Sequence, residues 1–252
     1  MQVQFDRIQK TYQSPNGEIP ALRDVSFSVE EGAFVSIVGP SGCGKTTLLN
    51  ILAGLEQPSG GRVLLDGEPV EGISPAVGYM PQKDQLFSWR TIWGNVILGL
   101  EIQGEKDGAH LNRVRELLRR YGLDGFDRKL PAQLSGGMWQ RVSLIRTLAT
   151  DPGLLLLDEP FSALDYQTRL SVSDDIHRII RQEGKTALLV THDIAEAVSM
   201  STQVVVLTRR PGTVRSIHDL SALDGLSPME RRDHPEFHRY FNDVWKELDH
   251  SA

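Results

Sequence analysis

Short runs dominated by apolar residues recur along the chain and are separated by more polar stretches. They occur at Phe34–Val38, Val63–Leu65, Val77–Met80, Leu154–Leu157, Ala187–Val190 and Val204–Leu207. The run at Leu154–Leu157 is uninterrupted, as is typical of a strand that is covered on both faces, and the last two runs are of the same type. Strand-like runs alternating with helix-like stretches predict an α/β fold with a mainly parallel sheet.

The middle third of the chain has a different pattern. Between about Thr91 and Leu134 there is no convincing buried strand, and Leu111–Tyr121 has charges interleaved with leucines at helical spacing. The segment Gly104–Gly108 is predicted as a loop between helices. We interpret this region, about residues 87–149, as a helical insertion within the α/β core.

The pattern changes again from about Ser221 onward. Apolar and aromatic residues in Asp233–Leu248 are spaced for one face of a helix. We expect a main domain over residues 1–220 and a C-terminal helical extension over residues 221–252, whose aromatic face most simply covers the core.

Composition narrows the class of protein. The chain has 252 residues, of which 40% are hydrophobic and 24% charged, values that are ordinary for a globular protein. The formal charge of −6 gives no sign of a basic surface, so no nucleic-acid partner is expected. The single cysteine, Cys43, excludes an internal disulfide and fits a reducing compartment. Since no signal peptide or membrane-spanning run is visible, we expect a cytoplasmic chain that meets a membrane only by docking to another protein.

One glycine-rich segment carries a strong chemical signal. Gly39-Pro40-Ser41-Gly42-Cys43-Gly44-Lys45-Thr46, followed by Thr47, fits the pattern GxxxxGK[ST]. Glycines allow backbone N–H groups to surround a phosphate, and the helix that follows adds a favourable dipole. Lys45 would reach the β- and γ-phosphates of a nucleotide, and the Thr46 hydroxyl would bind Mg²⁺.

The alternative to this P-loop is a chance glycine-rich turn. The predicted strand before it and the predicted helix Thr46–Leu52 after it favour the functional reading. Cys43 is interpreted as a small filler, although its place in an anion-binding turn predicts a lowered pKa and reactivity with alkylating agents.

Two carboxylates follow the buried run at Leu154–Leu157. Asp158 is the acid expected to bind Mg²⁺ directly or through water. On an extended chain the neighbouring Glu159 would point to the opposite side, where it could polarise the attacking water. The alternative is that both residues only cap the turn at Pro160.

A second glycine-containing turn occurs at Leu134–Arg141. Ser135 is a good N-cap residue for a helix that runs through about Ala149, and the amides at Gly136 and Gly137 form a second potential anion site. Because the first loop already surrounds one nucleotide's phosphates, the second turn makes sense if it closes over a nucleotide held by another subunit.

With these residues the sequence resembles the ATP-binding subunits of ABC transporters. The resemblance implies an ABC ATPase cassette, a P-loop core with an N-terminal antiparallel β part and an inserted α-helical subdomain. It covers about Phe5 to Leu207. The motifs that carry it are the P-loop, Met80–Gln82, Leu134–Gly137, Leu154–Pro160, Ser162–Asp165 and Thr191–Asp193.

The resemblance also implies roles for single residues. Tyr12 would stack on adenine, although it also fits a core tyrosine at a strand end. Gln82 would contact Mg²⁺ and the attacking water, and taken alone it would be an ordinary polar loop residue. His192 would contact the γ-phosphate, where an isolated histidine is more often a surface group. Asp165 would lie at the subunit boundary.

The mechanism implied by the resemblance needs two copies of the chain. They would close head to tail around two ATP molecules, with Ser135 and Gly137 of one copy facing the γ-phosphate held by the other. Glu159 would orient the water, while Lys45, Mg²⁺ and His192 would stabilise the transferred phosphoryl group. The signature helix departs from the family at Met138 and Trp139, but the LSGG core is intact.

The nearest group by resemblance is that of bacterial nitrate, sulfonate and taurine importers. It is suggested by Leu86–Thr91, Arg209–Gly212 and a tail containing Arg232–Phe237 and Trp245. This implies integral membrane permease subunits as partners, a solute-binding protein as an indirect partner, and a peripheral location on the cytoplasmic face of the bacterial inner membrane. The solute itself is not encoded in this chain. The alternatives are a soluble ABC ATPase that remodels a nucleic-acid or protein complex, and a scaffold that does not hydrolyse ATP.

Overall fold

A computed structural model describes residues 1–15, 17–83 and 86–249 of the chain. The larger sheet in this described part has six strands in the order β10-β9-β3-β8-β7-β6. All neighbouring strands are parallel except β10 and β9, so the prediction of a mainly parallel sheet is confirmed. The strands are β3 (Phe34–Val38), β6 (Val77–Met80), β7 (Leu154–Asp158), β8 (Thr186–Val190), β9 (Gln203–Leu207) and β10 (Val214–Asp219).

The strands of this sheet contribute side chains to three hydrophobic clusters, and β7 contributes to two of them. In β7, Leu155 and Leu157 pack with the helical insertion on one face, while Leu154 and Leu156 pack toward α1 (Lys45–Leu52) on the other. The alternation follows from the period of two in a strand. Because both faces are covered, the strand contains no polar residue before Asp158 at its end.

A second sheet is antiparallel and has the order β2-β1-β4-β5. Local pattern predicted only part of β4 here, and the antiparallel part was implied by the family resemblance alone. The core-facing residues of β1 are Val3, Phe5 and Ile8, and the register shifts between Phe5 and Ile8. This irregularity breaks the simple alternation that identifies a strand. The strands are β1 (Val3–Ser14), β2 (Gly17–Val29), β4 (Gly60–Leu65) and β5 (Glu68–Pro69).

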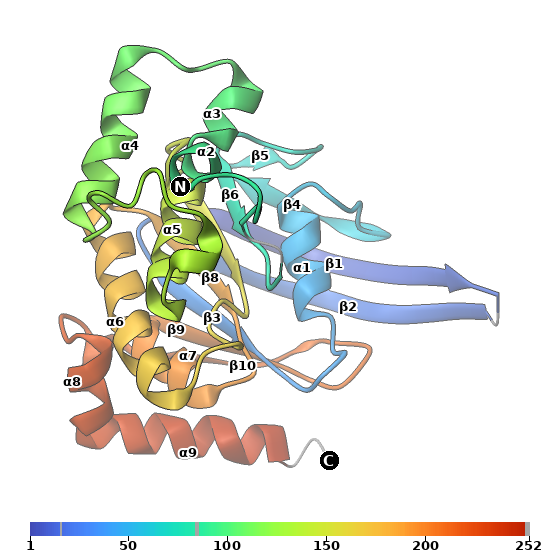
Figure 1. Cartoon of the computed structure of the whole chain (residues 1–252). Coiled ribbons are helices and arrows are strands. Elements are labelled where there is room, and N and C mark those ends of the chain that lie inside the picture. Colours follow the sequence, from blue (N-terminus) through green and yellow to red (C-terminus); the bar gives the residue numbers. More distant parts are fainter. Residues whose placement is uncertain (16, 84–85, 250–252) are drawn as a thin grey trace.

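The described residues between β6 and β7 contain helices and no strand, and α2, α3 and α4 of this segment lie in the upper part of the view in Figure 1. The helix predicted over Leu111–Tyr121 is longer in the structure and begins at Gly108, because Asp107 caps it by accepting from the His110 amide at 3.0 Å. The helices are α2 (Ile92–Val96), α3 (Leu98–Gln103), α4 (Gly108–Arg120), the 3₁₀ turn Pro131–Gln133 and α5 (Gly136–Leu148).

The C-terminal helices lie at the end of the molecule opposite α3 and α4 (Figure 1). The helix predicted over Asp233–Leu248 is present as α9, which begins at Pro235 after a break at His234. Phe237, Tyr240 and Val244 are buried, whereas Trp245 is 55% exposed. Residues 250–252 of the predicted extension lie outside the described residues. The other helices are α6 (Tyr166–Gln182), α7 (Ile194–Met200), the 3₁₀ turn Ser221–Leu223, α8 (Pro228–Asp233) and α9 (Pro235–Asp249).

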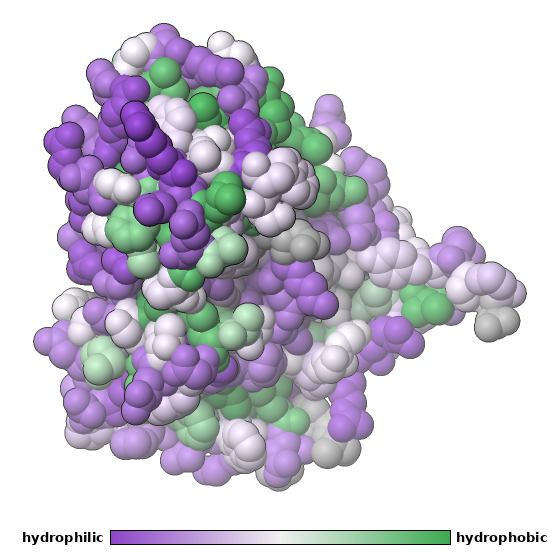
Figure 2. All heavy atoms as spheres, viewed as in Figure 1, coloured by the Kyte–Doolittle hydropathy of each residue, from purple (hydrophilic) through white to green (hydrophobic). Residues whose placement is uncertain are grey.

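Hydrophobic side chains are not evenly spread over the surface. Figure 2 shows hydrophobic residues gathered over α2 and α3 on the face in view. Ile102 of α3 is 78% exposed and Trp89, just before α2, is 75% exposed. Within the described ranges, no helix has the length and apolar character needed to cross a membrane.

Candidate functional site

A cavity of about 620 Å³ opens where the P-loop, the end of β7 and the N-terminal hairpin meet. It brings together residues that are far apart in the sequence, most of which the sequence analysis had selected. The lining residues are Tyr12, Ile19, Ala21, Ser41, Gly42, Gly44, Lys45, Thr46, Thr47, Gln82, Glu159, His192 and Arg210.

The P-loop connects β3 to α1 and depends on its glycines. Gly42 has a φ of 75° and Gly44 a φ of 104°, which side chains other than glycine rarely adopt. A Cβ atom on Gly39 would lie 2.8 Å from the Cys43 sulfur and 3.2 Å from the Leu207 carbonyl oxygen, so there is no room for one. The loop can therefore turn its backbone N–H groups toward an anion.

Lys45 lies across this loop. Its Nζ donates to the carbonyl oxygens of Gly39 at 2.8 Å and Pro40 at 3.1 Å, and the residue is 8% exposed. The ammonium group is held beside the loop by neutral acceptors, so a phosphate can take their place as its partner.

The two predictions made for Cys43 have different outcomes. It is 1% exposed, and burial raises the pKa of its thiol although the charge of Lys45 opposes the change. The prediction of a lowered pKa is therefore wrong, because the side chain points into the core behind the loop. Cys43 is the small filler that the sequence analysis described.

Asp158 ends β7 and faces the first turn of α1. Its Oδ1 accepts from the Thr46 hydroxyl at 3.4 Å, and its Oδ2 accepts from the Tyr79 hydroxyl at 3.3 Å. Burial raises the pKa of Asp158, and the charge of Glu159 adds to the rise. Thr46 and Asp158 thus place two hard oxygen ligands side by side, which is the donor set that Mg²⁺ prefers.

Glu159 leaves the strand in a conformation that the sequence analysis did not predict. Its φ is 45°, so the separation of the two carboxylates comes from a left-handed residue and not from the alternation of an extended chain. Its Oε2 accepts from Gln82 Nε2 at 2.8 Å and lies 3.3 Å from His192 Nδ1. The carboxylate is therefore bound to two other candidate catalytic residues, Gln82 and His192, and does not cap the turn at Pro160.

The N-terminal hairpin closes the opposite side of the cavity. Tyr12 is 36% exposed, so it is not the core tyrosine of the alternative reading. Its hydroxyl donates to Glu56 Oε2 at 2.7 Å and lies 3.1 Å from the Thr47 hydroxyl oxygen. These contacts fix the ring at the edge of the cavity, where it can stack on a nucleobase.

Sequence reasoning missed three lining residues, Ile19, Ala21 and Arg210. Ile19 pairs with Tyr12 across the hairpin, so a prediction of that register would have found it. Arg210 lies in the turn between β9 and β10. The neighbouring Gly212 joins this turn to β2, since its amide donates to the Ala21 carbonyl at 2.8 Å.

The second glycine turn does not contribute to this cavity. Ser135 caps α5 by accepting from the Met138 amide at 3.3 Å, as predicted for an N-cap. A Cβ atom on Gly136 would lie 3.0 Å from Leu164 Cδ2, and one on Gly137 would lie 2.9 Å from Val172 Cγ2. These glycines therefore allow the turn to approach α6 closely.

Asp165 is also outside the cavity. It is exposed and caps α6 by accepting from the Thr168 amide at 3.1 Å. One chain thus contains two separate groups of candidate residues, one in the cavity and one at the α5 and α6 N-termini.

Comparison with known proteins agrees with this geometry. The family model described as "ABC transporter" matches residues 22–162, which is more than half of the 252 residues. The chain is 46% identical over 244 residues to YtlC of Bacillus subtilis, described as an uncharacterized ABC transporter ATP-binding protein. The match covers 96% of this chain and 94% of YtlC.

Two importer subunits are also similar. The chain is 38% identical to the aliphatic sulfonates import ATP-binding protein SsuB of Bacillus cereus. This match extends over 217 residues and covers 86% of this chain and 85% of SsuB. The chain is also 43% identical to the taurine import ATP-binding protein TauB of Pseudomonas fluorescens. This match extends over 212 residues and covers 84% of this chain and 80% of TauB.

A solved structure of similar fold is the dimeric structure of MJ0796, described as a bacterial ABC transporter cassette. It is 32% identical, has a TM-score of 0.73, and the match covers 86% of this chain and 98% of that one. MJ0796 has also been solved as a dimer in a post-hydrolysis state bound to ADP and Pi, with a TM-score of 0.72. The predicted fold is confirmed, and the chain belongs to the ABC transporter family as an ATP-binding subunit with ATPase activity.

Proposed function

We propose that this chain is the ATPase subunit of an ABC importer, energising uptake of a small solute through a membrane permease. The solute would be of the nitrate, sulfonate or taurine type or related to it, since SsuB and TauB are named for sulfonate and taurine import. The subunit would work as a pair of identical chains on the cytoplasmic face of the bacterial inner membrane. A solute-binding protein would take part indirectly.

The observation that carries the hydrolytic part is the position of Glu159. Its carboxylate lies at the mouth of the P-loop cavity, 2.8 Å from Gln82 Nε2 and 3.3 Å from His192 Nδ1. A carboxylate that is held by two polar side chains next to a phosphate site is suited to orient a water molecule for attack.

Each remaining residue has a proposed task in the same reaction. The P-loop amides and Lys45 bind the phosphates, and His192 donates to the γ-phosphate. Thr46, Asp158 and the Gln82 carbonyl oxygen would hold Mg²⁺, which fits the pair of hard oxygen atoms 3.4 Å apart at Thr46 and Asp158. Bound Mg²⁺ would neutralise part of the negative charge on the phosphates.

Two copies are proposed because one chain does not place all the candidate residues together. Ser135, Gly136, Gly137 and Asp165 lie outside the cavity that holds Lys45 and Glu159. A second copy docked head to tail would supply them. That MJ0796, a cassette of similar fold, has been solved as a dimer supports a pair of chains.

A groove near Gln82 supports docking to a permease. It has a volume of about 210 Å³ and lies between β6, α3 and α5, with Met80, Leu98, Ile102 and Arg146 among its lining residues. Ile102 is 78% exposed at its rim. Because Met80 precedes Gln82 by two residues, a helix or loop of the permease in this groove would be connected directly to the cavity.

Glu159→Gln tests the hydrolytic role. We expect the purified full-length variant to bind ATP normally and to release phosphate at least about 100-fold more slowly, because the neutral amide no longer polarises water. Glu68→Gln is the control, since Glu68 is exposed on β5, away from the cavity. Near-normal phosphate release from Glu159→Gln would contradict the assignment of Glu159.

Ile102→Glu tests the permease. We expect it to keep phosphate release and to lose co-purification with membrane subunits, because a charge is placed at the rim of the groove. Ile73→Glu is the matched control, since Ile73 is 77% exposed but lies elsewhere. Finding the unmodified chain only in soluble complexes would support the remodelling alternative instead.

A further inference from the structure

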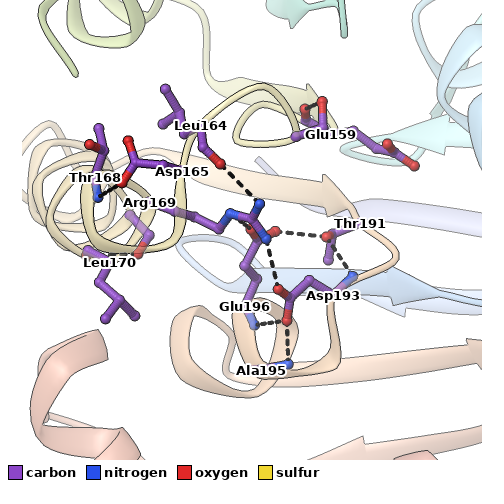
Figure 3. A network of polar contacts seen from close by, with 12 residues as sticks. Glu159, Leu164, Asp165, Thr168, Arg169, Leu170, Thr191, Asp193, Ala195 and Glu196 are labelled. Atoms are coloured by element: carbon purple, nitrogen blue, oxygen red, sulfur yellow. Dashed lines mark hydrogen bonds and ion pairs between the residues drawn. The ribbon is translucent and has the colours of Figure 1, made fainter. Parts of the chain in front are cut away.

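The loop that carries Asp165 and the loop that carries His192 are joined within one chain by a polar network (Figure 3). Its centre is Arg169, in the first turn of α6. Nη2 of Arg169 donates to the Leu164 carbonyl at 3.0 Å, and Nη1 donates to Asp193 Oδ2 at 3.1 Å. One guanidinium group therefore contacts the residue before Asp165 and the residue after His192.

The same network holds both neighbours of His192. Asp193 caps α7 by accepting from the amides of Ala195 at 2.8 Å and Glu196 at 3.1 Å. Thr191 donates its hydroxyl to Glu196 Oε2 at 2.7 Å, and its amide donates to the Ile37 carbonyl of β3 at 3.3 Å. His192 itself points to the cavity, so its position is set by residues on either side of it.

Glu196 is the buried member of the network. Its side chain is 4% exposed, and Oε1 lies 3.7 Å from Arg169 Nε. At this distance the two charges attract, but they form no hydrogen bond. Arg169 Nε is itself buried and has no hydrogen-bond partner within the described part of the chain. A buried N–H group without a partner lowers the stability of the fold. Its presence here therefore points to a role of Arg169 other than stabilisation.

We propose that Arg169 is a positioning residue that couples the Asp165 loop to the His192 loop, with Asp193 and Glu196 as its acidic partners. A second copy that moves the Asp165 loop would pull on the Leu164 carbonyl. Arg169 would transmit the movement to Asp193 and so change the position of the imidazole. The inference rests on the roles proposed above for Asp165 and His192.

The charge on Glu196 makes the coupling sensitive to pH. Burial raises the pKa of Glu196 to about 7; the charge of Asp193 adds to the rise, and the Thr191 hydrogen bond, Arg169 and His192 oppose it. Below this pH Glu196 is increasingly neutral and Arg169 loses part of its attraction to α7. Turnover by the unmodified chain should therefore rise through pH 7 relative to Glu196→Gln, which is neutral at every pH.

The first experiment measures kcat and KM for ATP by phosphate release from the full-length chain. We expect Arg169→Ala to lower kcat about tenfold, as a small displacement of a reacting group does, with KM changed by less than about twofold. Arg169→Lys should give an intermediate kcat, because one ammonium group cannot repeat the planar fork. Arg178→Ala is the matched control on α6, since among the described residues the Arg178 guanidinium pairs only with Asp175 of the same helix, at 2.6 Å.

A double-mutant cycle with His192→Ala separates this inference from the proposed function. If Arg169 acts through His192, the double variant loses no more activity than His192→Ala alone. Additive losses would overturn the coupling while leaving the role of His192 intact. Normal turnover by His192→Ala would overturn the role of His192 and with it the route proposed for Arg169.

Glu196→Gln keeps the inference testable if Arg169→Ala folds poorly, because it preserves the shape of the side chain. We expect its kcat at pH 8 to fall to the level that the unmodified chain shows near pH 6. Equal kcat values for Glu196→Gln and the unmodified chain at pH 8 would overturn the inference.

Discussion

Two glycine-containing turns of this chain each begin a helix, yet the glycines have different tasks. In the P-loop, Gly42 and Gly44 have positive φ values, and the loop surrounds a cavity that also contains Lys45. In the turn before α5, a Cβ on Gly136 or Gly137 would meet side chains of the α6 region at 3.0 and 2.9 Å. The first turn needs glycine for its backbone conformation, and the second needs it for close packing.

This difference has a functional meaning. The P-loop has the Lys45 ammonium group, a nearby pair of carboxylates and a cavity within one chain, so in the proposed function it binds the nucleotide. The α5 turn has a capped helix end, and none of its residues lines the cavity that contains Lys45. Substitutions in the first turn should therefore damage nucleotide binding, whereas substitutions in the second should damage only steps that need a second chain.

The largest effect is expected from Gly44→Ala. The new Cβ would lie 2.5 Å from the buried Leu22 Cδ2, in a backbone conformation with a φ of 104°. We expect ATP affinity to fall about 100-fold and the free energy of unfolding to fall by about 2–4 kcal/mol. Calorimetric titration and thermal melting measure the two effects.

Gly42→Ala is the control for this variant. Gly42 also has a positive φ, but a Cβ there would meet nothing within 4 Å, so it isolates the backbone strain. Equal losses in the two variants would mean that the contact with Leu22 is unimportant.

Gly137→Ala is expected to have the next largest effect, and of a different kind. ATP affinity should remain unchanged, while phosphate release should fall at least about tenfold, because the turn must move away from α6 and no longer meets a second chain correctly. The double variant Gly137→Ala with Val172→Ala removes the colliding methyl groups. Recovery of turnover in it would assign Gly137 to packing, and no recovery would assign it to contact with the partner's nucleotide.

Asp158→Asn tests whether the buried carboxylate beside the P-loop lowers the stability of the fold. The pKa of Asp158 is raised in the fold, chiefly by burial, so its stabilising contribution is present at low pH and is lost as pH rises through the folded value. At pH 8 without ATP, Asp158→Asn should therefore melt at a higher temperature than the unmodified chain, and the difference should shrink near pH 4. A lower melting temperature at pH 8 would contradict this reasoning.

The smallest effect is expected from Arg210→Ala. Arg210 lines the cavity from an exposed turn, so its attraction to a nucleotide is screened by water. We expect KM for ATP to rise about two- to fivefold, consistent with roughly 0.5–1 kcal/mol. Arg209→Ala should leave KM unchanged, because Arg209 is the neighbouring exposed arginine and does not line the cavity.

Sequence predicted the parallel core well because its signals are local. β6 has the predicted bounds Val77–Met80, and the strand, glycine loop and helix around Lys45 follow each other directly. β1 and β2 were harder, since the register shifts after Phe5 and the chain leaves a simple alternation. Irregular pairing of this kind is set by the partner strand, which local pattern does not contain.

The candidate site was predictable where a motif defines it and not where contact between distant segments does. Lys45, Asp158 and Glu159 belong to motifs that can be identified locally. Arg169 gives no such signal, because its partners Leu164 and Asp193 come from two different loops. The bend at Glu159 was also missed, since a positive φ at a glutamate has no sequence signature.

The two ends of the cavity belong to different sheets. Tyr12 and Ile19 face each other across the hairpin of the antiparallel sheet, while Lys45 and Glu159 follow strands of the parallel one. In the proposed orientation, the base of a nucleotide rests on the first sheet and its phosphates on the second. Evolution can therefore alter which nucleobase is accepted by mutating the hairpin, without disturbing the residues that cleave the phosphate bond.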